Sequence, residues 1–265
     1  MENNQQSTQQ DQSLYQFPTE EVTLPSKGIL YPEESPLKSG IIEMKYMTAK
    51  EEDILTNQNL IKNGTVIDKL LKSLIITNID YNELLIGDKN AILIASRILG
   101  YGQEYSFKYP HPTTGEEETV TVDLTEADDK VLDESLVKDS KNEFKFTLPH
   151  SKIDITFKLL CHGDESKIEQ EIKGLKKISK LTSADLTTRL KHMILSVNGD
   201  YTIKSIRNFV DNAFLARDAR ALREYAASIM PDTDLTFDIN FKDGASAEGV
   251  TIPIGTQFFW PESTI

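Results

Sequence analysis

The side chains best suited to covalent or proton-transfer chemistry are one cysteine and four histidines. The histidines are His111, His150, His162 and His192. Cys161 directly precedes His162, and a thiol beside an imidazole could form a nucleophile–base pair. Neighbouring residues on a strand point to opposite faces, however, and residues 155–160 have the pattern of a strand leading to this cysteine. We therefore expect Cys161 to pack as a buried or partly buried side chain.

Two pairs of adjacent carboxylates, Glu51–Glu52 and Asp164–Glu165, could work as general acid and base. Each pair stands at the start of an expected helix, where negative side chains stabilise the positive end of the helix dipole. Thr48 and Glu51 also have the spacing of a capping box. These acids are therefore predicted to cap helices.

Other sequence signals of catalysis and cofactor binding are missing. There is no phosphate-binding GxxxxGK[ST] loop, and no GxGxxG motif follows a strand. The histidines and the cysteine lack the clustering of a zinc site. We predict no enzymatic activity, no cofactor and no metal site. An envelope-directed hydrolase that uses Asp164, Glu165 and His162 is the enzymatic alternative.

The aromatic end of the chain is the first candidate surface for binding a partner. It consists of Phe258, Phe259, Trp260 and Pro261. Aromatic side chains dominate the energetics of both interfaces and cores. Two roles therefore stay open, packing under the last hairpin and contact with a partner protein.

An arginine stripe is the second candidate surface. Arg217, Arg220 and Arg223 have helical spacing, with Asp211 and Asp218 nearby. Ion pairs with these aspartates on a solvated helix face are one interpretation. Binding of the stripe to an acidic protein surface is the other.

Two stretches of the chain show the same order of elements. Thr-Leu-Pro occurs at residues 23–25 and again at 147–149, and an alternating apolar segment and a pair of acids follow each copy. The later elements that correspond are 70–76 with 190–197, 88–97 with 218–223, and 105–124 with 235–254. Within the first copy, Gly87-Asp88 is expected to cap a helix over 89–99. The order predicts an α+β fold with an internal duplication. Each of two related lobes would contain a small antiparallel sheet or hairpin and about three helices.

The predicted boundaries follow from composition. Residues 1–18 are rich in Gln, Asn and Ser and are predicted to form a disordered polar tail. The N-terminal lobe covers 19–124, an acidic linker covers 125–142, and the C-terminal lobe covers 143–265.

Composition also excludes some classes of protein. The chain has 29 basic and 42 acidic residues, a net charge of −13, which argues against binding to nucleic acid. Its apolar runs are shorter than the ~20 residues that cross a membrane. A single cysteine permits no internal disulfide, as is usual in a reducing compartment.

Four segments together resemble the baseplate hub assembly proteins of T4-type tailed bacteriophages. They are TLPSKGILYP, MTAKEEDIL, RILGYGQEY and IPIGTQFFWP, and they span residues 22–261 in order. The resemblance implies a late phage protein that acts in baseplate hub assembly through protein–protein contacts, as an assembly factor or chaperone. The alternative within this class is a permanent structural subunit of the hub.

The resemblance also implies the partners and the location. The partners would be other hub and tail proteins of the phage. The protein would act in the cytoplasm of the host bacterium during assembly, and the structural alternative would place it in the baseplate of the virion tail. The family offers no catalytic residues to transfer to this chain.

Overall fold

A computed structural model describes residues 18–137, 141–178, 184–254 and 256–259 of the chain. The fold is α+β, as predicted, with small antiparallel sheets of two or three strands. The first part of the chain contains β1 (Thr19–Thr23), β2 (Ile41–Lys45), α1 (Ala49–Leu55), α2 (Gln58–Lys62), α3 (Val66–Leu74), α4 (Ile86–Tyr101), β3 (Glu104–Pro110) and β4 (Glu117–Asp123). The second part contains β5 (Asp129–Lys130), β6 (Phe144–Thr147), β7 (Asp154–Phe157), α5 (His162–Ile178), α6 (Asp185–Met193), β8 (Ile194–Val197), α7 (Ile203–Asn212), α8 (Ala216–Ile229), β9 (Asp232–Thr233), β10 (Thr236–Asn240) and β11 (Ser246–Thr251).

The N-terminal part is built on the antiparallel pair β1–β2, which packs with α1, α3 and α4. Alternation along β2 buries Ile42 and Met44 and leaves their neighbours towards solvent. After α3 the chain returns to this sheet, because Ile75 forms an isolated bridge with Met44. The apolar side of α3 then buries Leu70, Leu71 and Leu74 completely.

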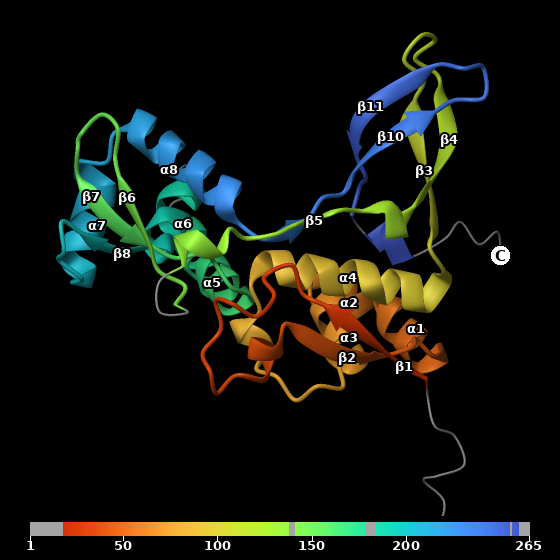
Figure 1. Ribbon diagram of the computed structural model, residues 1–265, viewed down its shortest axis with the longest axis horizontal. Helices are drawn as coiled ribbons and strands as arrows, with labels where there is room; N and C mark the ends of the chain where they lie inside the picture. Colours follow the sequence, from red (N-terminus) through yellow and green to blue (C-terminus); the bar gives the residue numbers. More distant parts are fainter. Residues whose placement is uncertain (1–17, 138–140, 179–183, 255, 260–265) are drawn as a thin grey trace, which may run out of the picture.

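Residues 143–231 form a second unit, which we call the body. Its sheet has the order β6-β7-β8, and α5 to α8 complete it (Figure 1). Phe157 of β7 is fully buried and packs against Phe144 and Tyr225. Strand β8 directly follows α6 and pairs with β7, much as Ile75 follows α3 and reaches β2.

The two long hairpins, β3–β4 and β10–β11, stand together as a projection, which we call the arm (residues 104–126 and 234–252; Figure 1). Strand β4 contacts β10, and the apolar faces of both hairpins are buried. His111 joins the two ends, since its ring packs on Phe241 and its Nε2 lies 3.2 Å from Asp243. The C-terminal hairpin therefore packs with the N-terminal hairpin rather than with the body.

A short two-stranded connector links the body to the rest of the chain. Strand β5 pairs with β9, and β9 lies on α4. The approach is so close that a Cβ at Gly87 would meet the Pro231 carbonyl oxygen at 1.7 Å, so only glycine fits there. In its described part, the predicted linker, 125–142, contains the end of the 3₁₀ turn Leu124–Glu126, then β5, and the 3₁₀ turn Glu134–Leu136.

The predicted disordered tail lies almost wholly outside the described residues, since the description begins at Pro18. The predicted internal duplication stays a hypothesis. Both parts nevertheless share a set of matched contacts at the starts of their helices.

Candidate functional site

Cys161 lies at the start of α5 and is held by a carboxylate. Its backbone N–H and its thiol both donate to Asp164 Oδ2, each at 3.2 Å, and Lys158 Nζ donates to Asp164 Oδ1 at 2.7 Å. Burial alone would raise the pKa of Asp164, but Lys158 and Cys161 hold it below its usual value. Burial raises the pKa of the Cys161 thiol. This environment disfavours the thiolate that a nucleophile needs.

His162 belongs to a different cluster, as predicted for neighbours that point apart. Its Nδ1 lies 3.3 Å from Lys89 Nζ, its Nε2 lies 3.7 Å from Asp68, and its ring packs edge-on against Tyr81. Burial lowers the pKa of His162, and Asp68 opposes this only in part. This cluster joins α5 of the body to α3 and α4 and offers Cys161 no base.

One acid of each pair, Glu51 or Asp164, accepts from the residue that precedes its helix, as the capping interpretation predicted. Glu51 completes a capping box with Thr48 and also accepts from Lys45 Nζ at 2.8 Å. Asp164 plays the same role at Cys161. Glu165 forms an ion pair with Arg189. Their local roles are thus explained by helix starts and ion pairs.

Within the described residues, no group of three or more His, Cys, Asp or Glu side chains is arranged to hold a metal ion. No helix in the same part of the chain combines the length and apolar character needed to cross a membrane.

The aromatic end of the chain is described only in part. Phe258 and Phe259, in the 3₁₀ turn Thr256–Phe259, are both fully buried. Phe258 packs edge-on against Tyr105 of β3, with 5.0 Å between ring centroids. These two rings therefore take the packing role and are not exposed for partner contact. Trp260 and Pro261 lie outside the described residues.

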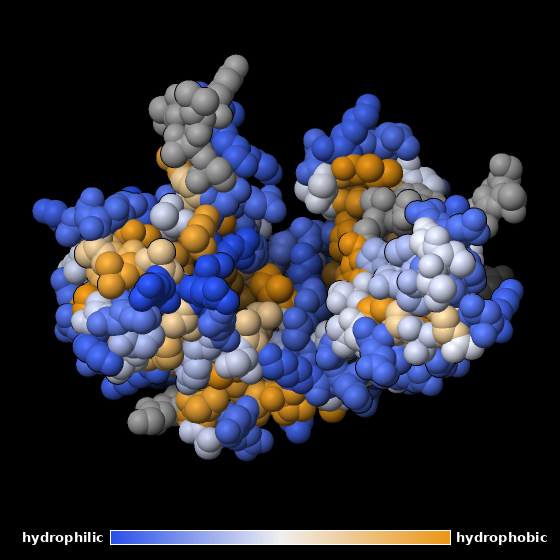
Figure 2. All heavy atoms as spheres, turned by 90° about the horizontal axis from the view of Figure 1, so that it is seen from above, coloured by the Kyte–Doolittle hydropathy of each residue, from blue (hydrophilic) through white to orange (hydrophobic). Residues whose placement is uncertain are grey.

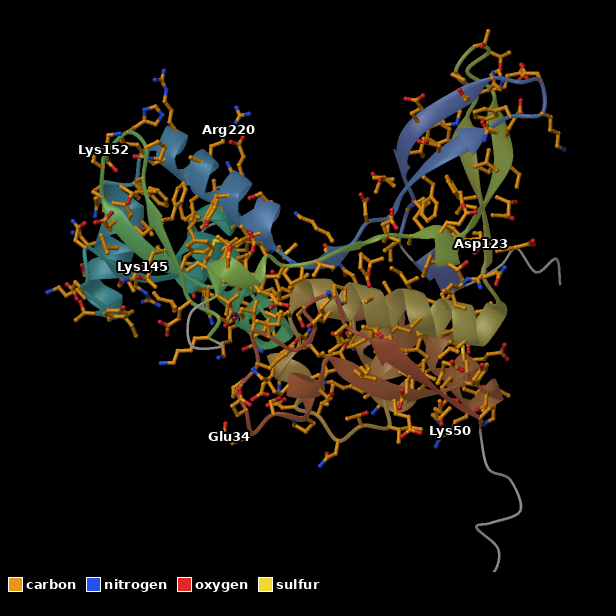
Figure 3. The ribbon with its side chains drawn as sticks, in the orientation of Figure 1. Glu34, Lys50, Asp123, Lys145, Lys152 and Arg220 are labelled. Atoms are coloured by element: carbon orange, nitrogen blue, oxygen red, sulfur yellow. The ribbon has the colours of Figure 1, made fainter. Side chains whose placement is uncertain are left out.

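The arginine stripe lies on the outer side of α8. Arg217, Arg220 and Arg223 are all exposed, and Figure 3 shows Arg220 pointing away from the helix into solvent. The expected ion pairs with Asp211 and Asp218 are absent from this described helix. Arg220 pairs instead with Glu224 at 2.7 Å.

The two aspartates near the stripe have other partners. Asp211 binds Lys191 at 2.6 Å. Asp218 is fully buried and accepts the backbone N–H groups of His150 and Ser151 at 2.8 and 3.0 Å. Neither carboxylate neutralises the stripe, and the carboxylate that does pair with it, Glu224, binds Arg220.

The arm is a further candidate surface for binding a partner, and no motif in the sequence indicated it. Residues 104–126 and 234–252 contain ten acidic and two basic residues, whereas the body, 143–231, contains eleven acidic and fifteen basic residues. Counting charge by segment would have shown the imbalance. That both acidic segments form one projection could be seen only in the fold (Figure 1).

Comparison with known proteins gives one match. The model of the T4 bacteriophage base plate protein family matches residues 21–260, which is most of the chain. Neither a curated protein nor a solved structure matches it. The matched range covers all the helices and strands described above except the first two residues of β1. It therefore includes both the arm and the body. The chain belongs to the family of T4 bacteriophage base plate proteins.

Proposed function

We propose that the protein acts in assembly of the phage baseplate hub by binding other baseplate proteins. The observation that carries the proposal is the family match over residues 21–260. Because the match covers nearly the whole fold and not one short motif, it supports a baseplate role for the protein as a whole. In this role the protein would bind hub subunits in an assembly-competent conformation more tightly than in other conformations, and so favour their joining.

The assembly role is tested by deleting the gene and counting complete hubs in infected cells. We expect hub components to accumulate unassembled in the lysate, with complementation by the intact gene as control. A normal yield of complete hubs without the protein would contradict the proposal.

Quantitative mass spectrometry then separates a transient factor from a permanent subunit. Purified particles and the lysate of infected cells are compared. We expect the protein in the lysate and its absence from particles. A fixed copy number in particles would instead make it a structural hub component in the virion tail.

We further propose that the protein works without catalysis. The Cys161 thiol has a raised pKa and no histidine partner, and the paired acids have capping roles. Replacement of His162 by Gln should leave hub assembly intact if the chain folds. Loss of assembly by a folded H162Q variant that still binds its partners would favour the hydrolase alternative.

A further inference from the structure

Charge is strongly segregated between two parts of the molecule. The arm has a formal balance of −8 (ten acidic, two basic residues), and the body has a balance of +4 (eleven acidic, fifteen basic). A protein needs no such separation to stay soluble, because charges of both signs can be interspersed over the surface. The separation gives this molecule one negative and one positive projection.

The negative projection presents a groove between its two hairpins. Between β4 and β10 lies a groove of about 770 Å³ whose lining includes Glu104, Asp123, Glu126 and Asp238. None of the four carboxylates forms an ion pair within the described part of the chain. The groove is therefore an acidic sheet surface without a cationic partner.

The positive projection presents a helix with the complementary charge. Arg217, Arg220 and Arg223 are exposed on α8, where Glu224 pairs with Arg220, and Asp218 is turned inward to the turn at His150. Guanidinium groups match carboxylates in both charge and hydrogen-bond geometry, so an arginine helix face suits an acidic groove.

The two projections rise on the same side of the molecule. Figure 1 shows α8 and the arm above α4 and the connector, and Figure 2, seen from above, shows a hollow between them. The hollow separates the acidic arm from the arginine face of its own chain. A second copy turned by a twofold rotation would place its arm over α8 of the first copy, and its own α8 over the arm of the first.

We propose that the protein forms a twofold dimer in which the acidic arm of each copy binds the arginine face of α8 in the other. Each contact occurs twice, which is how a twofold interface uses one pair of complementary patches. In this dimer the arginine face binds an acidic protein surface, which was the second of its two interpretations from the sequence. That surface belongs to another copy of the same protein. The dimer does not depend on the assembly role proposed above.

Sedimentation velocity of the purified full-length protein tests the dimer. We expect a dimer at about 50 mM salt and at least tenfold weaker association at about 500 mM, because exposed charge pairs are screened by salt. A monomer at every salt concentration would overturn the proposal.

Reversing the charges on α8 or on the arm tests whether these two surfaces form the interface. The variant R217E/R220E/R223E and the variant E104K/D123K/D238K should each be monomeric. An equimolar mixture of the two should form a heterodimer, because the acidic arm and acidic α8 of one variant meet the basic α8 and basic arm of the other. Homodimerisation of either folded variant, or no heterodimer from two folded variants, would contradict the proposed contact.

A control of equal charge distinguishes this contact from general repulsion. K167E/K173E/K177E reverses three exposed lysines on α5 and changes the net charge of the chain by the same amount as the α8 variant. This control should dimerise like the unmodified protein. Circular dichroism checks that every variant is folded.

Discussion

Helices α4 and α8 begin in the same way, yet their surroundings differ. Each follows a leucine N-cap, Leu85 or Leu215, and each has an aspartate at its third position. Asp88 of α4 accepts the Ser26 N–H at 2.9 Å, and Asp218 of α8 accepts the His150 N–H at 2.8 Å. Ser26 and His150 both come directly after Thr-Leu-Pro. The same contact therefore joins the same turn to the same helix position in both parts of the chain.

A second matched contact lies at the starts of α1 and α5. Lys45 binds Glu51, and Lys158 binds Asp164, each pair six residues apart with N–O distances of 2.8 and 2.7 Å. Two independent matches of this kind support the predicted duplication. We propose that the two parts are related repeats.

The two parts of the chain differ at the second position of these helices. At the second position of α4, Gly87 allows the connector to pack on the helix. At the equivalent position of α8 stands Arg217, which is exposed. At this position one helix is covered by its own chain, whereas the other exposes an arginine to solvent.

The largest expected effect is the loss of stability when the leucine of each Thr-Leu-Pro is replaced by alanine. Leu24 and Leu148 are both fully buried, so Leu24→Ala and Leu148→Ala should each destabilise the protein by about 3 kcal/mol. Urea denaturation followed by circular dichroism measures the loss. A loss at one site below a third of that at the other would show that the two turns are not equivalent.

Replacing each aspartate by asparagine should lower the stability by different amounts in the two parts of the chain. Asp218 binds two backbone N–H donors, so in Asp218→Asn the amide NH₂ would face one of them, at a cost of about 2–3 kcal/mol. Asp88 also accepts from the hydroxyls of Ser26 and Tyr31, which can rotate and accept in turn. Asp88→Asn should therefore cost about 1 kcal/mol in the same denaturation assay. The reverse order would contradict this explanation.

The pH dependence of these aspartates should have opposite signs. Burial raises the pKa of Asp88, so this group stabilises the fold when protonated, and its contribution is lost as the pH rises above the unfolded value of about 3.9. Burial would also raise the pKa of Asp218, but hydrogen bonds from His150 and Ser151 lower it. Its contribution is present above pH ~3.9 and is lost as the pH falls through the folded pKa.

Stability measured from pH 3 to 7 for the unmodified protein and both asparagine variants checks the signs. In the unmodified protein Asp88 lowers the stability as the pH rises, and D88N should remove this decrease. Asp218 raises the stability as the pH rises, and D218N should remove this increase. Parallel curves for the two variants would disprove the opposite linkage.

The smallest expected effect concerns the hydroxyl and the thiol that cap α1 and α5. Thr48 Oγ donates to Glu51 at 2.6 Å, whereas Cys161 Sγ donates to Asp164 at 3.2 Å. A thiol is the weaker donor. Thr48→Ala should cost about 1 kcal/mol, and Cys161→Ala less than half of that, as differences in urea midpoint at constant slope. An equal loss at both positions would show that the thiol donates as strongly as the hydroxyl.

Local features of the fold followed from the sequence because they depend on residues close in the chain. The capping box at Thr48–Glu51, the alternation that buries Ile42 and Met44, and both hairpins were predictable in this way. The separation of Cys161 from His162 was predicted for a strand, whereas Cys161 forms an isolated bridge with Leu85 and His162 begins α5. The boundary at Asp88 did not, because this residue lies inside α4 and binds partners 57 and 62 residues away.

The sequence by itself determined the capping box of α1, the two hairpins, the acidic balance of the chain and the arginine spacing on α8, since each depends on composition or on short-range order. Only the tertiary structure decided that the C-terminal hairpin leaves the body to join β3–β4, and that Phe258 is buried against Tyr105. Contacts between residues more than a hundred positions apart depend on which apolar faces meet, and many pairings of such faces satisfy the same local pattern. For that reason the arm became visible only in the folded chain.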